Sequence, residues 1–444
     1  MEFINKNSEK DIHIILFACL WISVWIFVRI LHLLAIIYGK WCLHKSNEME
    51  FIQQEYSFPG VSILKPLSFM DKYDANILSN LETFFTSKYP GKFEIIFCIQ
   101  DADDYKLQSI IHKLAARYPN VETQTFVGGK NVGVNPKINN LLPGYSAAKY
   151  ELIMISDSRI RMKKYTLRDM ASHMTDKVGM VHQMPFTYCE DDSLDDPIRL
   201  LEKIHFGTSF ARMYLVANCF GMNCAVGMSS IIRKSILEKV GGLETFGKYL
   251  AEDFFMAQAV LDSCHQIRIS SMPALQNSEK STITSFHNRI TRWAKLRNAM
   301  IPLASFCEPF SECILLGGLT SWSVMILFGW DPLSFFFIHL LVWFLMDWIL
   351  ILVIQDGFEP VNKFNFIVIW MFRELTVPYL YILSFLNKEI KWGSKRFRLK
   401  FGGEAELCDE IQEESKELWT LDGKIVNSGA SNEKKLQSLI LNCG

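Results

Sequence analysis

A run of four large apolar residues, 152–155, precedes Ser156 and Asp157. Such a run does not alternate between core and water, so we predict a strand buried on both faces, as in the centre of a parallel α/β sheet. The strand ends at Asp157, on the carboxyl edge where open α/β sheets bind ligands. A divalent cation on the phosphates of a nucleotide is one partner for this carboxylate. Taken alone, Asp157 is more typical of a loop aspartate that caps the next turn.

Other apolar runs alternate with stretches of helical spacing on both sides of this strand. Further strands are predicted at 61–67, 93–99, 121–127 and 178–185. Helical spacing is found at 76–85, 107–117, from residue 137 onward, and at 197–215. Strands that alternate with helices indicate a right-handed parallel layer. We therefore predict an α/β fold with a mostly parallel sheet.

Acidic residues follow two of these predicted strands. Asp101, Asp103 and Asp104 come after the strand at 93–99, and Asp157 ends the central strand. Three carboxylates within four residues repel one another unless water, donors or a cation compensate their charge. One acidic turn is usually a solvated loop, but two at the ends of successive strands favour a binding site.

Glu252 and Asp253 open a further apolar helix. The helix dipole stabilises acids in the first turn, so this pair is explained without any function. The functional interpretation is that one carboxylate is held ionised at a pocket and acts as a base. Position in the sequence alone does not tell which of Glu252 and Asp253 would be the base.

A basic and aromatic stretch follows at 289–293. Arg289 and Arg292 are three residues apart on a predicted helix and share a face, and Trp293 adjoins them. Two guanidiniums beside an aromatic ring suit a diphosphate, because each guanidinium binds phosphate oxygens with fork geometry. The alternative is a juxtamembrane cluster that meets lipid headgroups.

Four long apolar segments frame the α/β region. The first, 12–37, has 26 residues and no small-residue cleavage site after it, so we predict an uncleaved membrane anchor. The others lie near the C-terminus at 313–330, 333–354 and 366–386. They contain Asp347, Arg373 and Glu374, and charges in such segments usually face protein or a wet cavity. Arg373 and Glu374 are also consistent with a helix that lies in the membrane interface.

Charge and cysteine usage narrow the function classes. The formal net charge of -1 over 444 residues gives no basic field for a nucleic acid, so we expect no such partner. The 11 cysteines are scattered and form no Cys-x-x-Cys pair. This usage favours a reducing, cytosol-facing compartment over a disulfide framework.

Taken together, Asp104, Asp157, Asp253 and the Arg-x-x-Arg-Trp stretch resemble the ordered motifs of a processive-type GT-A glycosyltransferase. More motifs are similar to those of the ceramide glucosyltransferase family, at 61–67, 80–85, 100–104, 135–141, 206–209 and 251–254. The resemblance spans residues 12–403. It implies a Rossmann-like GT-A catalytic domain with transmembrane helices on its N- and C-terminal sides.

The resemblance also implies an activity. Glucose would pass with inversion from UDP-glucose to the primary hydroxyl of ceramide, the first step of glycosphingolipid synthesis. Asp101 and Asp104 would serve the uridine-nucleotide end, Asp157 would hold Mg²⁺ or Mn²⁺, and Asp253 would be the general base. The positions that match the family near the diphosphate and the acceptor are Arg289, Arg292 and Trp293.

One position departs from the family pattern. The family carries His after Phe-Gly-Thr-Ser, whereas this chain has Phe210. Either an imidazole is dispensable there or the acceptor pocket differs. The runner-up function is a membrane glycosyltransferase that uses another lipid, such as a polyisoprenyl phosphate, or a growing polysaccharide as acceptor.

The pattern divides the chain into an anchor (12–37), a connector (38–58), a GT-A catalytic domain (59–300), a transmembrane or interfacial region (301–390), a basic membrane-proximal segment (391–403) and a polar tail (404–444). We expect a Golgi or other endomembrane protein, embedded in the lipid bilayer, whose catalytic domain faces the cytosol. The basic stretch 388–400 favours the same side. Three membrane spans between the catalytic domain and this basic stretch would place them on opposite sides of the membrane. We therefore expect one of the three segments to be re-entrant or interfacial, or 301–310 to add a pass.

Overall fold

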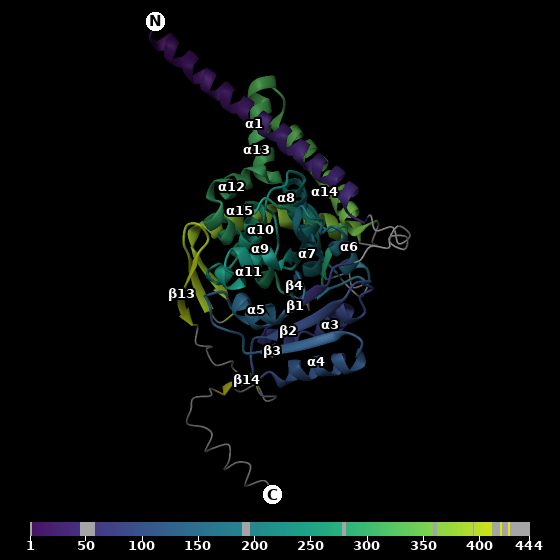
Figure 1. Ribbon diagram of the computed structural model, residues 1–444. Helices are drawn as coiled ribbons and strands as arrows, with labels where there is room; N and C mark the ends of the chain where they lie inside the picture. Colours follow the sequence, from purple (N-terminus) through teal and green to yellow (C-terminus); the bar gives the residue numbers. More distant parts are fainter. Residues whose placement is uncertain are drawn as a thin grey trace.

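The computed structural model describes residues 2–44, 58–188, 196–277, 281–357, 362–393 and 395–410, and two short strands, β14 (Leu418–Trp419) and β15 (Ile425–Val426). Most of the predicted connector, 38–58, and of the predicted polar tail, 404–444, lies outside these residues. Figure 1 shows a globular α/β part and long helices that extend from one side of it.

The globular part is built on a seven-stranded sheet with the order β3-β2-β1-β4-β8-β6-β9. Its strands are β1 (Val61–Leu67), β2 (Phe93–Ile99), β3 (Glu122–Val127), β4 (Leu152–Ser156), β6 (Val178–His182), β8 (Ser229–Arg233) and β9 (Gln266–Ile269). β8 runs antiparallel to β4 and β6, and the remaining neighbours pair in parallel. The prediction of a mostly parallel α/β sheet is confirmed.

β4 is buried on both faces, as its apolar run predicts. Met154 belongs to the hydrophobic cluster on one face of the sheet, whereas Ile153 and Ile155 belong to the cluster on the other. The helices beside the sheet are α3 (Ile77–Phe85), α4 (Tyr105–Arg117), α5 (Pro136–Ala147), α6 (Thr166–Ser172), α9 (Lys234–Lys239) and α10 (Glu252–Asp262). Two 3₁₀ helices, η1 (Phe69–Tyr73) and η3 (Leu243–Lys248), connect them. Because helices cover both faces, ligands reach this sheet at the strand ends.

Two smaller sheets flank the large one. The first, with order β5-β10-β7, contains β5 (Ile160–Arg161), β7 (Pro185–Thr187) and β10 (Ala274–Gln276). The predicted strand 178–185 is thus divided, because Pro185 begins β7 and the chain passes into another sheet. The second is a meander of β11 (Glu389–Trp392), β12 (Lys395–Leu399) and β13 (Ala405–Glu410). The basic segment 391–403 therefore lies largely within a folded sheet.

The predicted helix 197–215 consists of three pieces: α7 (Pro197–His205), a π-helix η2 (Phe206–Phe210) and α8 (Ala211–Cys219). A Cβ on Gly207 would lie 2.6 Å from Cγ1 of Ile351, so the glycine permits a close approach of η2 to a membrane helix. π-helices are often found at functional sites.

Three helices are long and apolar enough to cross a membrane: residues Ile12–Cys42 of α1 (Glu2–Cys42), α14 (Pro332–Gln355) and α15 (Lys363–Leu386). A bent pair, Pro302–Ser311 and Cys313–Phe328, forms a fourth candidate with a bend of 67°. It comprises α12 (Pro302–Cys307), η4 (Glu308–Ser311) and α13 (Cys313–Phe328). The prediction of membrane helices on both sides of the catalytic region is confirmed.

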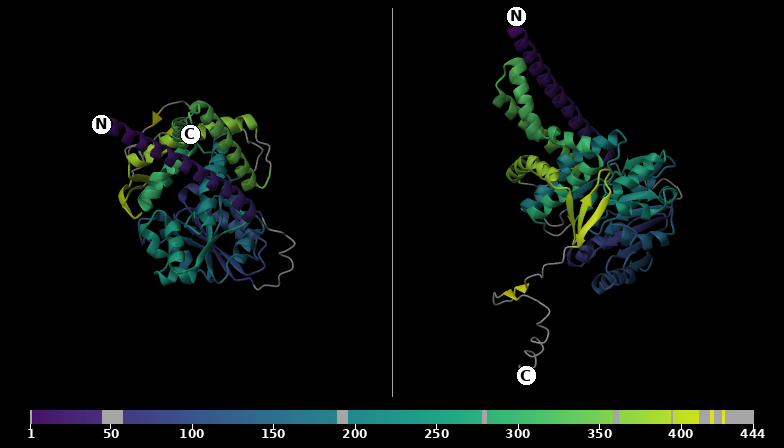
Figure 2. Two further views of the ribbon diagram at one scale, coloured as in Figure 1. Left: turned by 90° about the horizontal axis from the view of Figure 1, so that it is seen from above. Right: turned by 90° about the vertical axis from the view of Figure 1, so that its left-hand side faces the viewer.

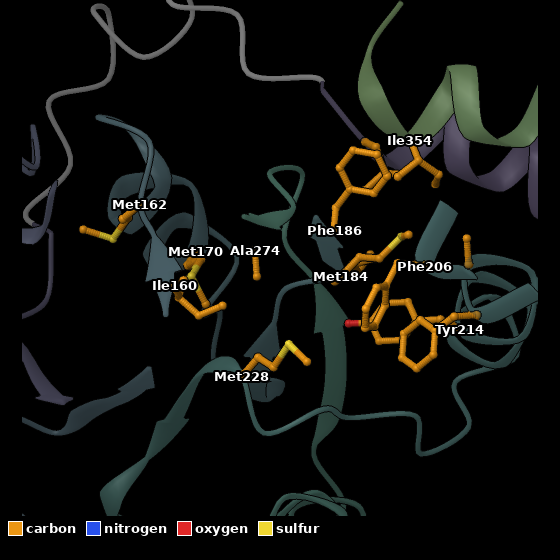
Figure 3. Packing of buried hydrophobic residues seen from close by; sticks show 14 of the residues in the cluster. Ile160, Met162, Met170, Met184, Phe186, Phe206, Tyr214, Met228, Ala274 and Ile354 are labelled. Atoms are coloured by element: carbon orange, nitrogen blue, oxygen red, sulfur yellow. The ribbon is translucent and has the colours of Figure 1, made fainter. Parts of the chain in front are cut away.

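These helices fall into two groups. α1, α13 and α14 contact one another and extend beyond the globular part (Figures 1 and 2). α15 packs mainly on α7 and on α11 (Ile283–Met300), and its Trp370 also donates to Asp347 of α14 (2.9 Å). Figure 3 shows the junction with the core, where Ile354 of α14 lies beside Phe186, and Phe206 and Tyr214 lie beside Met184.

Candidate active site

The carboxyl end of β4 places Asp157 at the edge of the sheet. Its backbone N–H donates to the carbonyl of Met228 (2.9 Å), and its side chain is 39% exposed. The Lys65 ammonium, buried in β1, donates to the carbonyl of Asp157 (2.6 Å). Burial lowers the pKa of Lys65 to about 7. Hydrogen bonds of its backbone therefore fix Asp157, and its side chain does not cap a helix. This differs from the alternative interpretation, in which Asp157 is a loop aspartate that caps the next turn.

Lys137 is the centre of the charged groups around Asp157. Its Nζ lies 2.8 Å from Oδ1 of Asp157 and 3.1 Å from Oε1 of Glu252, and it donates to the carbonyl of Gly227 (2.8 Å). Burial acts to lower the pKa of Lys137, but the charges of Asp157 and Glu252 raise it overall. We call Lys137, Asp157, Glu252 and Asp253 the strand-edge site.

The local sequence explains why Lys137 points there. Asn135 caps α5, because its side-chain oxygen accepts from the backbone N–H groups of Lys137 (2.8 Å) and Ile138 (3.3 Å). Pro136 follows at the first helical position, where its missing N–H costs nothing. Asn-Pro-Lys is thus a helix start that holds a cation in the first turn. The helix dipole opposes a cation there, so the two carboxylates must supply the stabilisation.

The structure separates the roles of Glu252 and Asp253, which both lie in the first turn of α10. Both oxygens of Glu252 are engaged, one by Lys137 and the other by Nδ2 of Asn135 (2.8 Å). Oδ2 of Asp253 accepts from the backbone N–H of Gly227 (2.5 Å). Burial and the charge of Glu252 raise the pKa of Asp253 to about 7. Asp253 is thus the carboxylate with the capacity to take up a proton near neutral pH.

The acidic turn after β2 lies at the same edge. Two strand spacings of about 4.8 Å separate β2 from β4, so the ends of these strands are about 10 Å apart. Asp104 is buried and caps α4 by accepting from the backbone N–H of Leu107 (3.2 Å). Its Oδ2 has no hydrogen bond and lies 3.5 Å from Nζ of Lys72. Oδ1 of Asp101 accepts from the backbone N–H of Asp103 (3.1 Å).

Arg289, Arg292 and Trp293 lie on α11 but have different partners. Arg289 donates to Oε1 of the buried Glu202 at 2.8 Å. The Arg292 guanidinium instead lies over the ring of Trp392 in β11, 5.5 Å from its centroid. Burial and Arg289 lower the pKa of Arg292. Sequence reasoning identified the arginines but not these partners, which come from elements distant in the chain.

Trp293 lines a large cavity between the globular part and the membrane helices. The cavity has a volume of about 520 Å³ and is walled by α1, α7, η2, α8, α11, η4 and α15. Most of its lining is apolar, including Val28, Met213, Ile290 and Leu380. We call it the membrane cavity.

The charged residues of the membrane cavity are paired with one another. Glu312 lies 3.4 Å from a guanidinium nitrogen of Arg212 and 3.3 Å from one of Arg373. Arg297 donates to both carboxylate oxygens of Glu308, at 3.1 and 3.0 Å. The cavity therefore presents an apolar wall with its ions already compensated, which suits a lipid tail.

The strand-edge site fits a divalent cation only as part of a complex with phosphate. In the described part of the chain, no three His, Cys, Asp or Glu side chains gather to hold a metal ion. Mg²⁺, however, usually binds through one or two carboxylates together with substrate phosphates and waters. The half-exposed Asp157 meets this requirement, although Lys137 contacts its Oδ1. Asp157 is the residue that would hold the ion.

Comparison with known proteins assigns a class to this fold and site. The model of glycosyl transferase family 21 matches residues 27–405. The chain is therefore a glycosyltransferase. It belongs to glycosyl transferase family 21, and the resemblance to the ceramide glucosyltransferase family is confirmed.

Among the relatives, ceramide glucosyltransferase 1 of Caenorhabditis elegans is 40% identical over 404 residues, which cover 90% of this chain and 84% of the relative. Ceramide glucosyltransferase 3 of the same organism is 38% identical over 377 residues, with coverages of 84% and 79%. Among solved structures, a mannosyltransferase from Pyrobaculum calidifontis in complex with GDP-Man and Mn²⁺ has a TM-score of 0.45 at 13% identity, with coverages of 77% and 98%.

Proposed function

We propose that this protein transfers glucose from UDP-glucose to the primary hydroxyl of ceramide, with inversion, and so forms glucosylceramide. The observation that carries the proposal is the pairing of a charged strand-edge site with an apolar cavity at the membrane helices. α11 relates to both, because Ile290 and Trp293 line the cavity and the charge of Glu252 acts on Arg292. The relatives named ceramide glucosyltransferase support the same substrates.

Inversion requires one in-line displacement at the anomeric carbon of glucose. Asp253 takes the proton of the ceramide hydroxyl, and the hydroxyl oxygen forms a bond to the anomeric carbon. The bond from that carbon to the β-phosphate oxygen breaks, and UDP leaves with the electron pair. A raised pKa near 7 matches this role, because the base must be deprotonated at working pH and must still bind a proton.

The leaving UDP carries the charge that must be stabilised. Arg292 is suited to bind the diphosphate, because its guanidinium rests on Trp392 and no carboxylate within the described residues forms an ion pair with it. Arg289 supports α11 through its ion pair with Glu202. A Mg²⁺ or Mn²⁺ ion held by Asp157 would supply further positive charge on the diphosphate.

The nucleotide end of UDP-glucose is assigned to the acidic turn after β2. Oδ2 of Asp104 is buried and faces Nζ of Lys72 at 3.5 Å, so an N–H donor such as that of a uracil ring would have to replace this ion pair. Asp101 lies at the start of this turn, where its Oδ1 accepts from the backbone N–H of Asp103. Together these residues extend the site from Asp157 across the edge of the sheet.

The helix arrangement supports a membrane topology with the catalytic domain, 59–300, on the cytosolic side of a Golgi or other endomembrane. α1 crosses once, and α13 and α14 form a hairpin whose turn contains Gly329 and Asp331. This turn lies at the same end of the molecule as the N-terminus (Figure 1). α15 packs on α7 and α11, so we assign it to the interface. In this proposed topology the catalytic domain and the basic meander share one side, in line with the expectation that one C-terminal segment is interfacial.

Product analysis tests the proposed function. The full-length protein in lipid vesicles is incubated with UDP-glucose and one acceptor at a time: ceramide, a polyisoprenyl phosphate or an oligosaccharide. We expect glucosylceramide with the β configuration from ceramide, and no product from the other two. Transfer to the polyisoprenyl phosphate instead of ceramide would establish the runner-up function.

A further inference from the structure

His205 lies at the junction of α7 and the π-helix η2, and it lines the membrane cavity. Its ring is surrounded by the rings of Phe206 (5.5 Å between centroids), Phe286 (5.5 Å) and Phe210 (6.3 Å). Burial lowers the pKa of His205 well below its usual value, and Arg373, Arg289 and Arg297 lower it further. The imidazole is therefore neutral, with one nitrogen that donates and one that accepts.

Among the residues that the structure describes, none forms a hydrogen bond with this imidazole. The other uncharged polar side chains of the cavity have partners: Ser209 donates to Glu312 (3.0 Å), and Ser311 donates to the carbonyl of Glu308 (2.7 Å). Tyr381 bonds to Glu308. Among the uncharged polar residues that line the cavity, within the described residues, His205 and Trp293 have no hydrogen bond. Neither residue is among the described residues with buried, unpaired polar atoms, so these ring nitrogens are open to the cavity, where a ligand can bind them.

His205 and Trp293 lie on the same aromatic rim. Trp293 contacts Phe206 (5.9 Å) and Phe210 (6.2 Å), the same two rings that contact His205. Trp293 also adjoins Arg292, which we assign to the leaving diphosphate. The Arg289 guanidinium lies 5.6 Å from the ring centroid of Phe206 and 5.8 Å from that of Trp293. The rim is therefore the part of the cavity wall beside the basic residues of α11, where the proposed reaction would place the polar head of the acceptor.

We propose that His205 binds a hydroxyl of the lipid acceptor other than the hydroxyl that reacts. This inference rests on the proposed function and deepens it. A hydroxyl both donates and accepts, so it satisfies a neutral imidazole in either tautomer, whereas an amide N–H or carbonyl serves only one. In ceramide the group with this property is the secondary hydroxyl on carbon 3. His205 is thus a residue that selects sphingoid acceptors over lipids with an unsubstituted chain.

The π-helix offers an internal rescue for the test. His205 and Phe210 are five residues apart, which is about one turn of a π-helix, and both line the cavity. An imidazole at position 210 should therefore enter the same space. The double variant His205→Phe/Phe210→His keeps the composition of the rim and moves only the ring nitrogens.

The experiment measures kcat and KM in mixed micelles for a short-chain ceramide and for its 3-deoxy analogue. For the wild type, loss of the 3-hydroxyl should raise KM about tenfold, which is the size expected for one buried hydrogen bond. His205→Phe should show the raised KM with ceramide and no further loss with the analogue. Its KM for UDP-glucose and its melting temperature should stay at wild-type values. The double variant should recover most of the affinity for ceramide.

Controls and contrary outcomes separate this inference from the proposed function. His112→Phe, on the exposed face of α4, should leave all parameters unchanged. His205→Leu replaces His205→Phe if the latter fails to fold. If the wild type makes no glucosylceramide, both proposals fall. If the wild type makes it but His205→Phe still distinguishes ceramide from the 3-deoxy analogue as strongly as the wild type, only the role of His205 is wrong.

Discussion

The strand-edge site and the membrane cavity handle buried charge in different ways. At the strand edge, Lys137 contacts Asp157 and Glu252 directly, so an incoming diphosphate and metal ion must exchange with existing partners. In the cavity, Glu312 with Arg212 and Arg373 form a closed set that a lipid need not disturb. The difference teaches that the strand-edge site, our proposed donor site, requires exchange of ionic partners, whereas the membrane cavity, our proposed acceptor site, only has to be filled.

Asp253→Asn should have the largest effect, and it tests whether the strand-edge site contains the base. Asparagine keeps the shape but cannot accept the proton, so kcat should fall by about 10²- to 10⁴-fold. UDP-glucose binding, measured by calorimetry, should persist.

Glu252→Gln is the matched control for Asp253→Asn. Because Lys137 and Asn135 hold Glu252, we expect this change to weaken stability and nucleotide binding more than turnover at saturation. If Glu252→Gln abolished turnover and Asp253→Asn did not, the two assignments would be reversed.

Arg292→Ala should have the next largest effect, because it removes the positive charge that we assign to the leaving diphosphate. Loss of one such interaction with the leaving group typically costs about 100-fold in kcat. Arg292→Lys should recover only part of the activity, because an ammonium lacks the fork geometry and the stacking on Trp392.

Lys295→Ala, on the same helix, is the control for Arg292. Its Nζ donates to the carbonyl of Glu389 (2.9 Å), away from the cavity lining. Full activity in Arg292→Lys, together with equal losses in Arg292→Ala and Lys295→Ala, would indicate a lipid-headgroup cluster instead.

Asp157→Asn should sharpen the comparison between the strand-edge site and the membrane cavity. It removes the carboxylate that we expect to exchange Lys137 for a metal ion, and it leaves the buried strand β4 intact. We expect roughly 10- to 100-fold weaker UDP binding in saturating Mn²⁺, the range for a hydrogen bond to a charged group. UDP binding with chelator present should change little. Asp103→Asn, exposed on the acidic turn, serves as the control. Wild-type UDP affinity of Asp157→Asn in saturating Mn²⁺ would contradict the assigned role.

The pH profile should give the smallest effect. The pKa of Asp253 is raised to about 7, so the carboxylate that accepts the proton is lost as the pH falls through that value. Between pH 8 and pH 6, kcat should therefore fall about tenfold, as expected for one group that titrates at pH 7. A kcat that stays constant over this pH range would show that Asp253 is not the base.

The sequence predicts the strand-edge site better than the cavity. β4 and Asp157 are predictable because burial of the strand and the position of its acid depend on consecutive residues. The bridge by Lys137 is not, since its partners Asp157 and Glu252 lie 20 and 115 residues further along the chain. The capped helix start at Asn135 and Pro136 was the available signal.

The cavity escapes sequence reasoning because its walls come from elements spread along the chain from α1 to α15. Apolar spacing at 197–215 predicts one helix, and it does not reveal the π-helix at Phe206–Phe210. That distortion accompanies the close approach of Gly207 to Ile351 of α14, a contact between residues far apart in sequence. The pairs Arg289–Glu202 and Arg292–Trp392 are hidden for the same reason.

The walls of the membrane cavity have a kinetic consequence. α1, which contributes Val28, is long and apolar enough to cross a bilayer, and α15, which contributes Leu380, is the helix that we assign to the membrane interface. An acceptor lipid then enters by lateral diffusion, and its effective concentration is its mole fraction in the leaflet. Diluting vesicles of fixed composition into buffer should leave the turnover per enzyme unchanged at saturating UDP-glucose. Diluting ceramide with phosphatidylcholine in the same vesicles should lower it, so the enzyme responds to the composition of its own membrane.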